Sequence, residues 1–249
     1  MNNLLKYTIH LADNAHILGH RLGEWCGHGP ILEQDIALTN ISLDLIGQAR
    51  SLYQYAAEIE AKGRTEDDIA YLRDAWDFKN CLMVEQPNGN FGKTIVRQFL
   101  FDAYNFLFYS ALVNSSDERL AAIAEKSLKE VTYHLRFSSE WVIRLGDGTE
   151  VSHEKVQTAL NDLWMYTGEL FEMNDFEREM ASSGIGVDLE QLKPLWEKKV
   201  NDILTTATLT KPENEWMQKG GKTGTHSEHL GFILAEMQFL QKTYPGQVW

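Results

Sequence analysis

The chain is poor in the residues that stabilise small secreted proteins or separate domains. It has 2 cysteines and 5 prolines among 249 residues, and no Gly/Ser-rich linker. Cys26 and Cys81 do not form a CxxC pair, so the sequence does not resemble a disulfide scaffold. A chain of this length with 43% hydrophobic residues can bury one substantial core. We therefore predict a single domain over residues 1–249.

Positive charge is scarce as well. The sequence has 23 Lys and Arg against 36 Asp and Glu, which gives a formal net charge of -13 and a pI of about 5.0. Nucleic-acid-binding domains are usually basic, so this function class is disfavoured. An acidic surface favours solubility and contact with a basic partner face.

Long apolar runs are missing too. No stretch approaches the ~18 uninterrupted apolar residues of a membrane helix. The first six residues, Met1–Lys6, lack the charged lead-in and apolar run of a signal peptide. These absences predict a cytoplasmic protein with no membrane partner.

Helical periodicity dominates what is present. Apolar residues spaced by three and four predict four long amphipathic helices, and no alternating run indicates a strand. Further helices are expected over about 66–81, 152–172, 188–206 and 226–243. Together they predict an all-α fold, with a core bundle over about 3–146 and a helical extension over about 150–249. The four long stripes span Leu4–Trp25, Ile41–Ile59, Ile95–Val113 and Ala124–Leu145.

The connections carry helix-boundary signals. Pro30 suits the first turn of the second long helix. The segment 114–117 ends the third long helix and offers a cap for the fourth.

Four polar residues interrupt or border the apolar stripes. Gln48 lies between Leu45 and Leu52, and Asp102 between Phe99 and Phe106. His134 lies close to the inward face of the fourth long helix, and His16 shares a face with small and apolar residues of the first. Burying such groups without partners costs several kcal/mol, so each is expected to have one.

A metal site is one explanation for these residues. Helical bundles hold two metals with a carboxylate on each of two helices and Glu-x-x-His on each of the other two. No Glu-x-x-His occurs on the four long helices, and Glu130 and His134, four apart, form only a partial set. The ligand count therefore favours hydrogen-bonded core groups over a working metal site.

The segment His226–His229 contains two histidines and a glutamate, which could bind a metal. However, Thr225 and Glu228 fit a capping box at the start of the last helix, and this interpretation is favoured. The glycines of 220–224 suit a loop and do not follow the phosphate-binding GxxxxGK[ST] pattern. No G-x-S-x-G motif is present, nor a cysteine with a convincing histidine partner.

Aromatic residues cover more than one face of the third long helix. A helix that is hydrophobic on most sides is buried on most sides. We expect internal burial for most of them and a protein interface for any surplus. The set is Phe99, Phe101, Tyr104, Phe106, Phe108 and Tyr109.

Nearly end to end, the sequence resembles the C-subunit family of bacterial phenylacetyl-CoA epoxidase, also called 1,2-phenylacetyl-CoA monooxygenase. Five segments together make the resemblance specific. They are Arg21–His28, Leu43–Arg50, Val84–Phe91, Lys129–Phe137 and Gly220–Gly231.

The resemblance implies a ferritin-like four-helix bundle with additional C-terminal helices. It also implies a multicomponent monooxygenase that uses oxygen and NADPH to convert phenylacetyl-CoA to its ring 1,2-epoxide. In that family a homologous A subunit carries the di-iron centre, and the C subunit pairs with it as a structural component. A B subunit and a reductase with flavin and iron–sulfur groups complete the system. No catalytic residue and no cofactor are then expected in this chain, which would form homo- and hetero-oligomers.

The catalytic subunit's ligand pattern can be placed on this sequence by its motifs. The first-helix Glu falls at or near His16, and Asp-Glu-Ala-Gly-His falls on residues 44–48. Leu45 then replaces Glu and Gln48 replaces His. The third-helix acid is kept as Asp102. Lys-Glu-Glu-x-x-His falls on 129–134, so that a valine replaces the second Glu and the histidine is kept. The resemblance therefore implies a degenerate metal site at His16, Leu45, Gln48, Asp102, Val131 and His134.

The leading hypothesis is a noncatalytic subunit that supports a di-iron partner, with Asp102 and His134 bonded to neighbours in a metal-free core. One alternative is a divergent ferritin-like di-metal oxidase that uses Glu130, His134, Asp102 and His16. The other is a stand-alone helical adaptor without any connection to an oxygenase.

Overall fold

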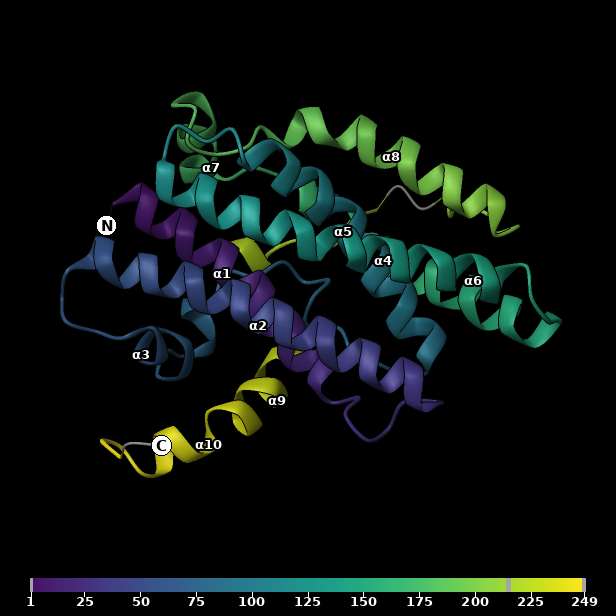
Figure 1. Ribbon diagram of the computed structural model, residues 1–249, viewed down its shortest axis with the longest axis horizontal. Coiled ribbons are helices and arrows are strands. Elements are labelled where there is room, and N and C mark those ends of the chain that lie inside the picture. Colours follow the sequence, from purple (N-terminus) through teal and green to yellow (C-terminus); the bar gives the residue numbers. More distant parts are fainter. Residues whose placement is uncertain (1, 214–215, 248–249) are drawn as a thin grey trace. The chain divides into compact units, whose positions relative to one another are not determined.

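The computed structural model describes residues 2–213 and 216–247, and every regular element in these ranges is helical (Figure 1). The all-α, ferritin-like class predicted from the sequence is confirmed. The chain divides into two compact units. The first unit joins residues 1–86 to 220–249, and the second comprises residues 87–219.

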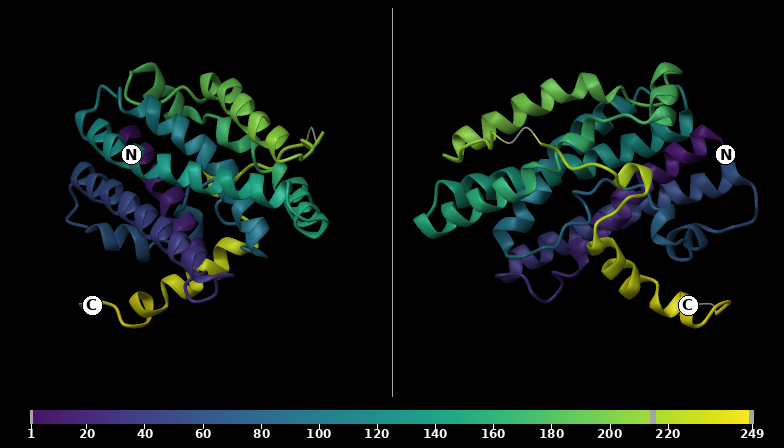
Figure 2. Two further views of the ribbon diagram at one scale, coloured as in Figure 1. Left: turned by 45° about the vertical axis from the view of Figure 1, so that its right-hand side comes forward. Right: turned by 180° about the vertical axis from the view of Figure 1, so that it is seen from behind.

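The first unit is built on a pair of long antiparallel helices, α1 and α2, which lie side by side (Figures 1 and 2). Their facing stripes include Leu18, Ile41 and Leu45, all fully buried. Shorter elements from both ends of the unit pack around this pair. The elements are α1 (Asn3–Gly23), α2 (Leu32–Glu60), α3 (Glu66–Tyr71), η1 (Ala75–Asp77), η3 (Gly221–Thr223), α9 (Glu228–Met237) and α10 (Phe239–Thr243).

The second unit is built on the antiparallel pair α4 and α5, against which α6 and α8 pack. Trp196 on α8 shows how these helices are joined. Its indole Nε1 donates a hydrogen bond to the carbonyl of Leu100 on α4 at 3.0 Å. The elements are α4 (Phe91–Leu112), α5 (Glu118–Gly146), α6 (Glu150–Trp164), η2 (Gly168–Phe171), α7 (Asp175–Ser182) and α8 (Leu189–Thr206).

Local caps fix several helix starts. The Asp117 side chain accepts from the backbone N–H of Leu120 at 2.9 Å and begins α5, which confirms the predicted cap. Asn90 begins α4 in the same way, accepting from the N–H of Lys93 at 3.0 Å.

Four predicted boundaries are wrong. Pro30 precedes α2, which begins at Leu32 after the extended N-cap Ile31. The helix expected over 66–81 ends at Tyr71, and a separate 3-10 turn follows. The helix expected over 152–172 ends at Trp164, where the Thr167 hydroxyl donates to the Trp164 carbonyl at 2.8 Å. The helix expected over 226–243 is divided into α9 and α10.

Internal burial accounts for most of the aromatic surplus on α4. Five of the six rings are buried, and Phe106 is half-buried. Phe171 of η2 covers Tyr104 in an edge contact, with ring centroids 5.8 Å apart. Lys199 of α8 lies over Phe106, its Nζ 5.1 Å from the ring centroid. The elements that follow α5 therefore cover the α4 aromatic face, as expected.

None of the helices in the described residues has the length and hydropathy needed to cross a membrane.

Candidate functional site

The six positions matched to metal ligands all lie on long helices and are all buried. Three belong to the first unit and three to the second. The buried set is His16 on α1, Leu45 and Gln48 on α2, Asp102 on α4, and Val131 and His134 on α5.

Asp102 is the centre of a polar network in the second unit. Its Oδ1 accepts a hydrogen bond from Gln98 Nε2 at 2.7 Å, and its Oδ2 accepts from Ser138 Oγ at 2.8 Å. The same Ser138 oxygen lies 3.0 Å from the carbonyl oxygen of His134. Burial raises the pKa of Asp102 to about 6, against the opposing influence of His134, Ser138 and Gln98. The carboxylate thus bonds α4 to α5.

His16 lies among aromatic rings in the first unit. Its ring meets those of His20, Tyr53 and Tyr71 edge to face, with centroids 4.7, 5.5 and 5.6 Å away. Burial lowers the pKa of His16 well below its usual range, helped by His20 and Arg73, and burial lowers the pKa of His20 to about 4. Both imidazoles are therefore neutral at pH 7, and aromatic contacts hold the ring of His16.

The donor chemistry of these positions does not fit a two-metal centre. Leu45 and Val131, which stand at two glutamate positions of the ligand pattern, have no atom that can coordinate a metal. The one buried carboxylate of the set, Asp102, has a hydrogen bond on each oxygen. Among residues 2–213 and 216–247, no three His, Cys, Asp or Glu side chains gather into a group that could hold a metal. Glu130 is half-buried, with Lys126 Nζ 4.0 Å from its carboxylate.

Replacing Asp102 by asparagine tests this network through pH. A carboxyl whose pKa is raised in the folded state binds its proton more tightly there, so its contribution to stability declines as pH rises from about 4 to about 6. Over that interval, wild type is expected to lose up to about 3 kcal/mol of unfolding free energy relative to Asp102→Asn. Urea unfolding at pH 4, 5, 6 and 7.5 measures the difference. The exposed control Asp147→Asn should follow wild type, and parallel curves for Asp102→Asn would show that the carboxyl does not titrate there.

A second buried carboxylate, Glu85, connects the two segments of the first unit. It accepts from the backbone N–H of Ser227 at 2.7 Å, from Asn80 Nδ2 at 3.1 Å and from His226 Nδ1 at 3.0 Å. The other ring nitrogen of His226 lies 2.9 Å from the carbonyl oxygen of Phe78. Burial alone would lower the pKa of His226, but the hydrogen bond and charge of Glu85 outweigh burial and raise it. With an acceptor at each nitrogen, the ring is an imidazolium.

This arrangement overturns the predicted capping box. The N-cap of α9 is Ser227, which makes no side-chain cap, and Thr225 lies outside the helix. Glu85 binds the N–H of Ser227 from 142 positions away. A distant carboxylate therefore takes the place of a local cap, and the histidine-rich segment has a structural role.

A buried ion pair between α1 and the segment after α3 was not predicted either. Asp13 accepts from Tyr53 Oη at 2.6 Å, from Arg73 Nη1 at 3.1 Å and from the backbone N–H of Lys79 at 2.8 Å. Burial raises the pKa of Tyr53, and the charge of Asp13 raises it further. The sequence signal was Asp13 itself, an acid one turn before His16 on the inward face of the first helix.

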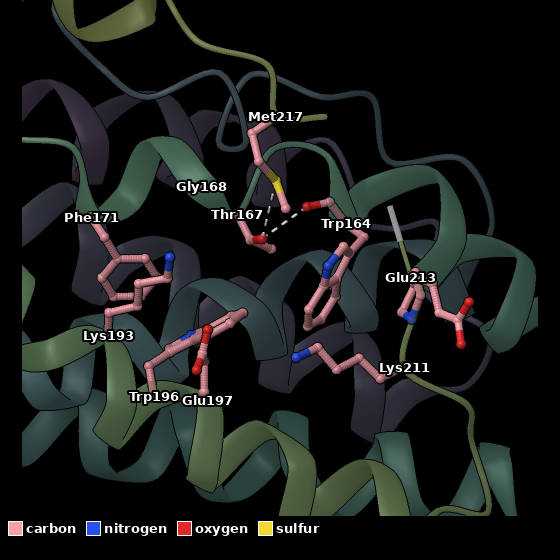
Figure 3. A pocket seen from close by; sticks show the side chains of 11 residues that line it. Trp164, Thr167, Gly168, Phe171, Lys193, Trp196, Glu197, Lys211, Glu213 and Met217 are labelled. Carbon is pink, nitrogen blue, oxygen red and sulfur yellow. Dashed lines mark hydrogen bonds between the residues drawn. The ribbon is translucent and has the colours of Figure 1, made fainter. Parts of the chain in front are cut away.

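The second unit also contains a pocket of about 490 Å³ between η2, α8 and the segment after α8 (Figure 3). Trp164, Phe171 and Trp196 form its aromatic wall, and Lys211 Nζ lies 5.5 Å from the centroid of the Trp164 ring. Its charged side chains are two lysines and two glutamates, so their charges balance and indicate no ligand of either sign. They are Lys193, Lys211, Glu197 and Glu213.

Comparison with known proteins identifies the family. The model of the phenylacetic acid catabolic protein family matches residues 1–249. The chain belongs to this family. It is 50% identical, over all 249 residues and the full length of both chains, to the C subunit of 1,2-phenylacetyl-CoA epoxidase from Escherichia coli strain K12.

Membership of the phenylacetic acid catabolic protein family confirms the resemblance seen in the sequence. The E. coli relative is one component of a multi-subunit enzyme, which places this chain among proteins that work with partner chains. The match has no gap in coverage at either end, so both units belong to the shared architecture.

Proposed function

We propose that this chain is a noncatalytic, structural subunit of a phenylacetyl-CoA 1,2-epoxidase that acts in aerobic phenylacetate degradation. The observation that carries the proposal is the identity of 50% over the full length to the C subunit of such an epoxidase. The donor chemistry of the six buried positions agrees with it, because apolar side chains stand at two glutamate positions of the ligand pattern.

In this proposal the chain stabilises and orients a catalytic A subunit that contains the di-iron centre. The complex also includes a B subunit and a reductase with flavin and iron–sulfur groups, which draws electrons from NADPH. Oxygen chemistry takes place on the A subunit. The residues of this chain hold its two helix pairs through Asp102 and Asp13, and so give the partner a fixed surface.

Separate and joint purification tests the proposal. We expect the isolated chain to contain no stoichiometric iron, and the A subunit purified with it to contain iron and to epoxidise phenylacetyl-CoA with reductase and NADPH. Without this chain, activity should fall to background. Stoichiometric iron in the isolated chain, lost on Asp102→Ala or His134→Ala, would favour a di-metal oxidase. Full activity of the partner alone would refute the supporting role.

A further inference from the structure

The C-terminal arm, defined as α9 and α10 (residues 228–243), is held to the rest of the first unit by one face. Leu230, Ile233 and Leu234 on that face are buried. Gln238 Nε2 donates to the carbonyl of Arg73 at 2.9 Å, and Lys242 Nζ lies 2.9 Å from Asp74 Oδ1. These contacts fix the arm beside η1, from which it extends away from the α1–α2 pair (Figures 1 and 2).

The opposite face of the arm is apolar as well, and it is exposed. Phe232 is 64% exposed and Phe239 is 61% exposed, and these two rings follow one another at helical spacing. A helix that is apolar on both faces is normally covered on both. Other large exposed apolar side chains stand on the arm or in the adjoining η1 and C-terminal segment. They are Trp76, Leu240 and Tyr244.

A groove of about 370 Å³ runs between the arm and η1. Ala75 forms one wall, and Leu234, Ala235 and Phe239 are among the residues of the other. Its lining is mostly small or apolar, which suits the apolar side chains of another helix. Exposed apolar patches with polar rims mark protein-interaction sites.

The rim of this face is acidic. Asp77, Glu228 and Glu236 are exposed, and none of them pairs with a cation among the described residues. The nearby ammonium groups are already engaged, Lys242 by Asp74 and Lys79 by the carbonyl of Trp76 at 2.6 Å. A second copy of this chain would bring like charges together, whereas a surface with a basic rim would complement them.

We propose that the outer face of the C-terminal arm docks another subunit of the same epoxidase, through an apolar helix flanked by lysine or arginine side chains. The inference rests on the proposed function, which supplies the partner chains. The groove receives the apolar side chains of that helix, and Glu236 and Asp77 meet its basic flanks. Apolar contact gives most of the affinity, and the charges give orientation and a dependence on salt.

The test is binding of the full chain to each of the other epoxidase subunits, measured by biolayer interferometry at low and high salt. The double variant Phe232→Ser/Phe239→Ser should weaken one of these interactions by roughly 30-fold or more, as expected for two aromatic anchors. Glu236→Lys should weaken the same interaction and reduce its salt dependence. Matched controls are Val151→Ser and Glu125→Lys, which change exposed residues of the second unit. Because Phe232 and Phe239 are exposed, the double variant should unfold at the wild-type temperature.

The outcomes separate the inference from the function on which it rests. If the wild-type chain binds no epoxidase subunit, the proposed function fails and the inference fails with it. If wild type binds and the arm variants bind equally well, only the docking inference is overturned. Self-association of the chain, seen by light scattering and abolished by the double variant, would assign the face to a second copy and overturn the proposed partner.

Discussion

Asp13→Ala is expected to lower the free energy of unfolding by about 3–5 kcal/mol, the usual cost of removing one partner of a buried ion pair. Alanine would leave the Arg73 guanidinium nearly buried without its counter-charge. It would also remove the acceptor of the Tyr53 hydroxyl and of the Lys79 N–H. Desolvated donors without acceptors add to the cost. Equilibrium urea unfolding of the full chain at pH 7 measures the loss.

The matched control is an ion pair of similar geometry in water. Lys198 Nζ lies 2.8 Å from Asp202 Oδ2, with both side chains mostly exposed, and Asp202→Ala should cost about 0–1 kcal/mol. The double variant Asp13→Ala/Arg73→Met should be more stable than Asp13→Ala alone, because no uncompensated charge remains buried. A loss of less than about 1 kcal/mol for Asp13→Ala would show that the pair is already hydrated.

Glu85→Gln is the second substitution with a large expected effect, and its effect depends on pH. A glutamine cannot present acceptors to Ser227, Asn80 and His226 together, and it removes the counter-charge of the imidazolium. We expect a loss of about 3–5 kcal/mol at pH 6. At higher pH the loss should be smaller, because a neutral His226 can accept a hydrogen bond from the new amide.

The sign of the pH effect follows from the raised pKa of His226. Its contribution to stability is fully present below the unfolded pKa of about 6.5 and disappears as pH rises through the folded pKa. Wild type should therefore lose stability above about pH 6.5, and Glu85→Gln should lack this decline. Unfolding from pH 5.5 to 9, with a histidine NMR titration, checks both points. The exposed control Glu140→Gln should keep the wild-type profile, and an unchanged profile for Glu85→Gln would refute the ion pair.

The long helices could be predicted from sequence because their signal is local and repeated. Apolar residues every three or four positions fix which side of α1, α2, α4 and α5 is buried, and Asp117 marks the start of α5 within three residues. The short elements could not be placed as well. The shortest helices have too few turns for periodicity, and α9 begins where a carboxylate from another part of the chain binds its first turn.

Partners of the buried polar residues were harder to predict than their burial. The position of Asp102 on an apolar stripe showed that it needed hydrogen bonds, and the structure gives one within its own helix and one from α5. The Asp13–Arg73 pair spans 60 positions and the Glu85–His226 pair spans 141. Such pairs depend on how the backbone folds back on itself, and spacing along the sequence contains no trace of them.

The first unit cannot be completed until almost the whole chain has been synthesised. His226 leaves the ribosome 141 residues after Glu85, which at ~5–20 residues per second is a delay of about 7–28 s. The second unit lies wholly within that interval and has its full sequence before the first unit does. During this time Glu85 has neither His226 nor Ser227 beside it. A nascent chain that stops before residue 220 would contain a complete second unit and an unfinished first one, so quality control of this protein depends on its last tenth.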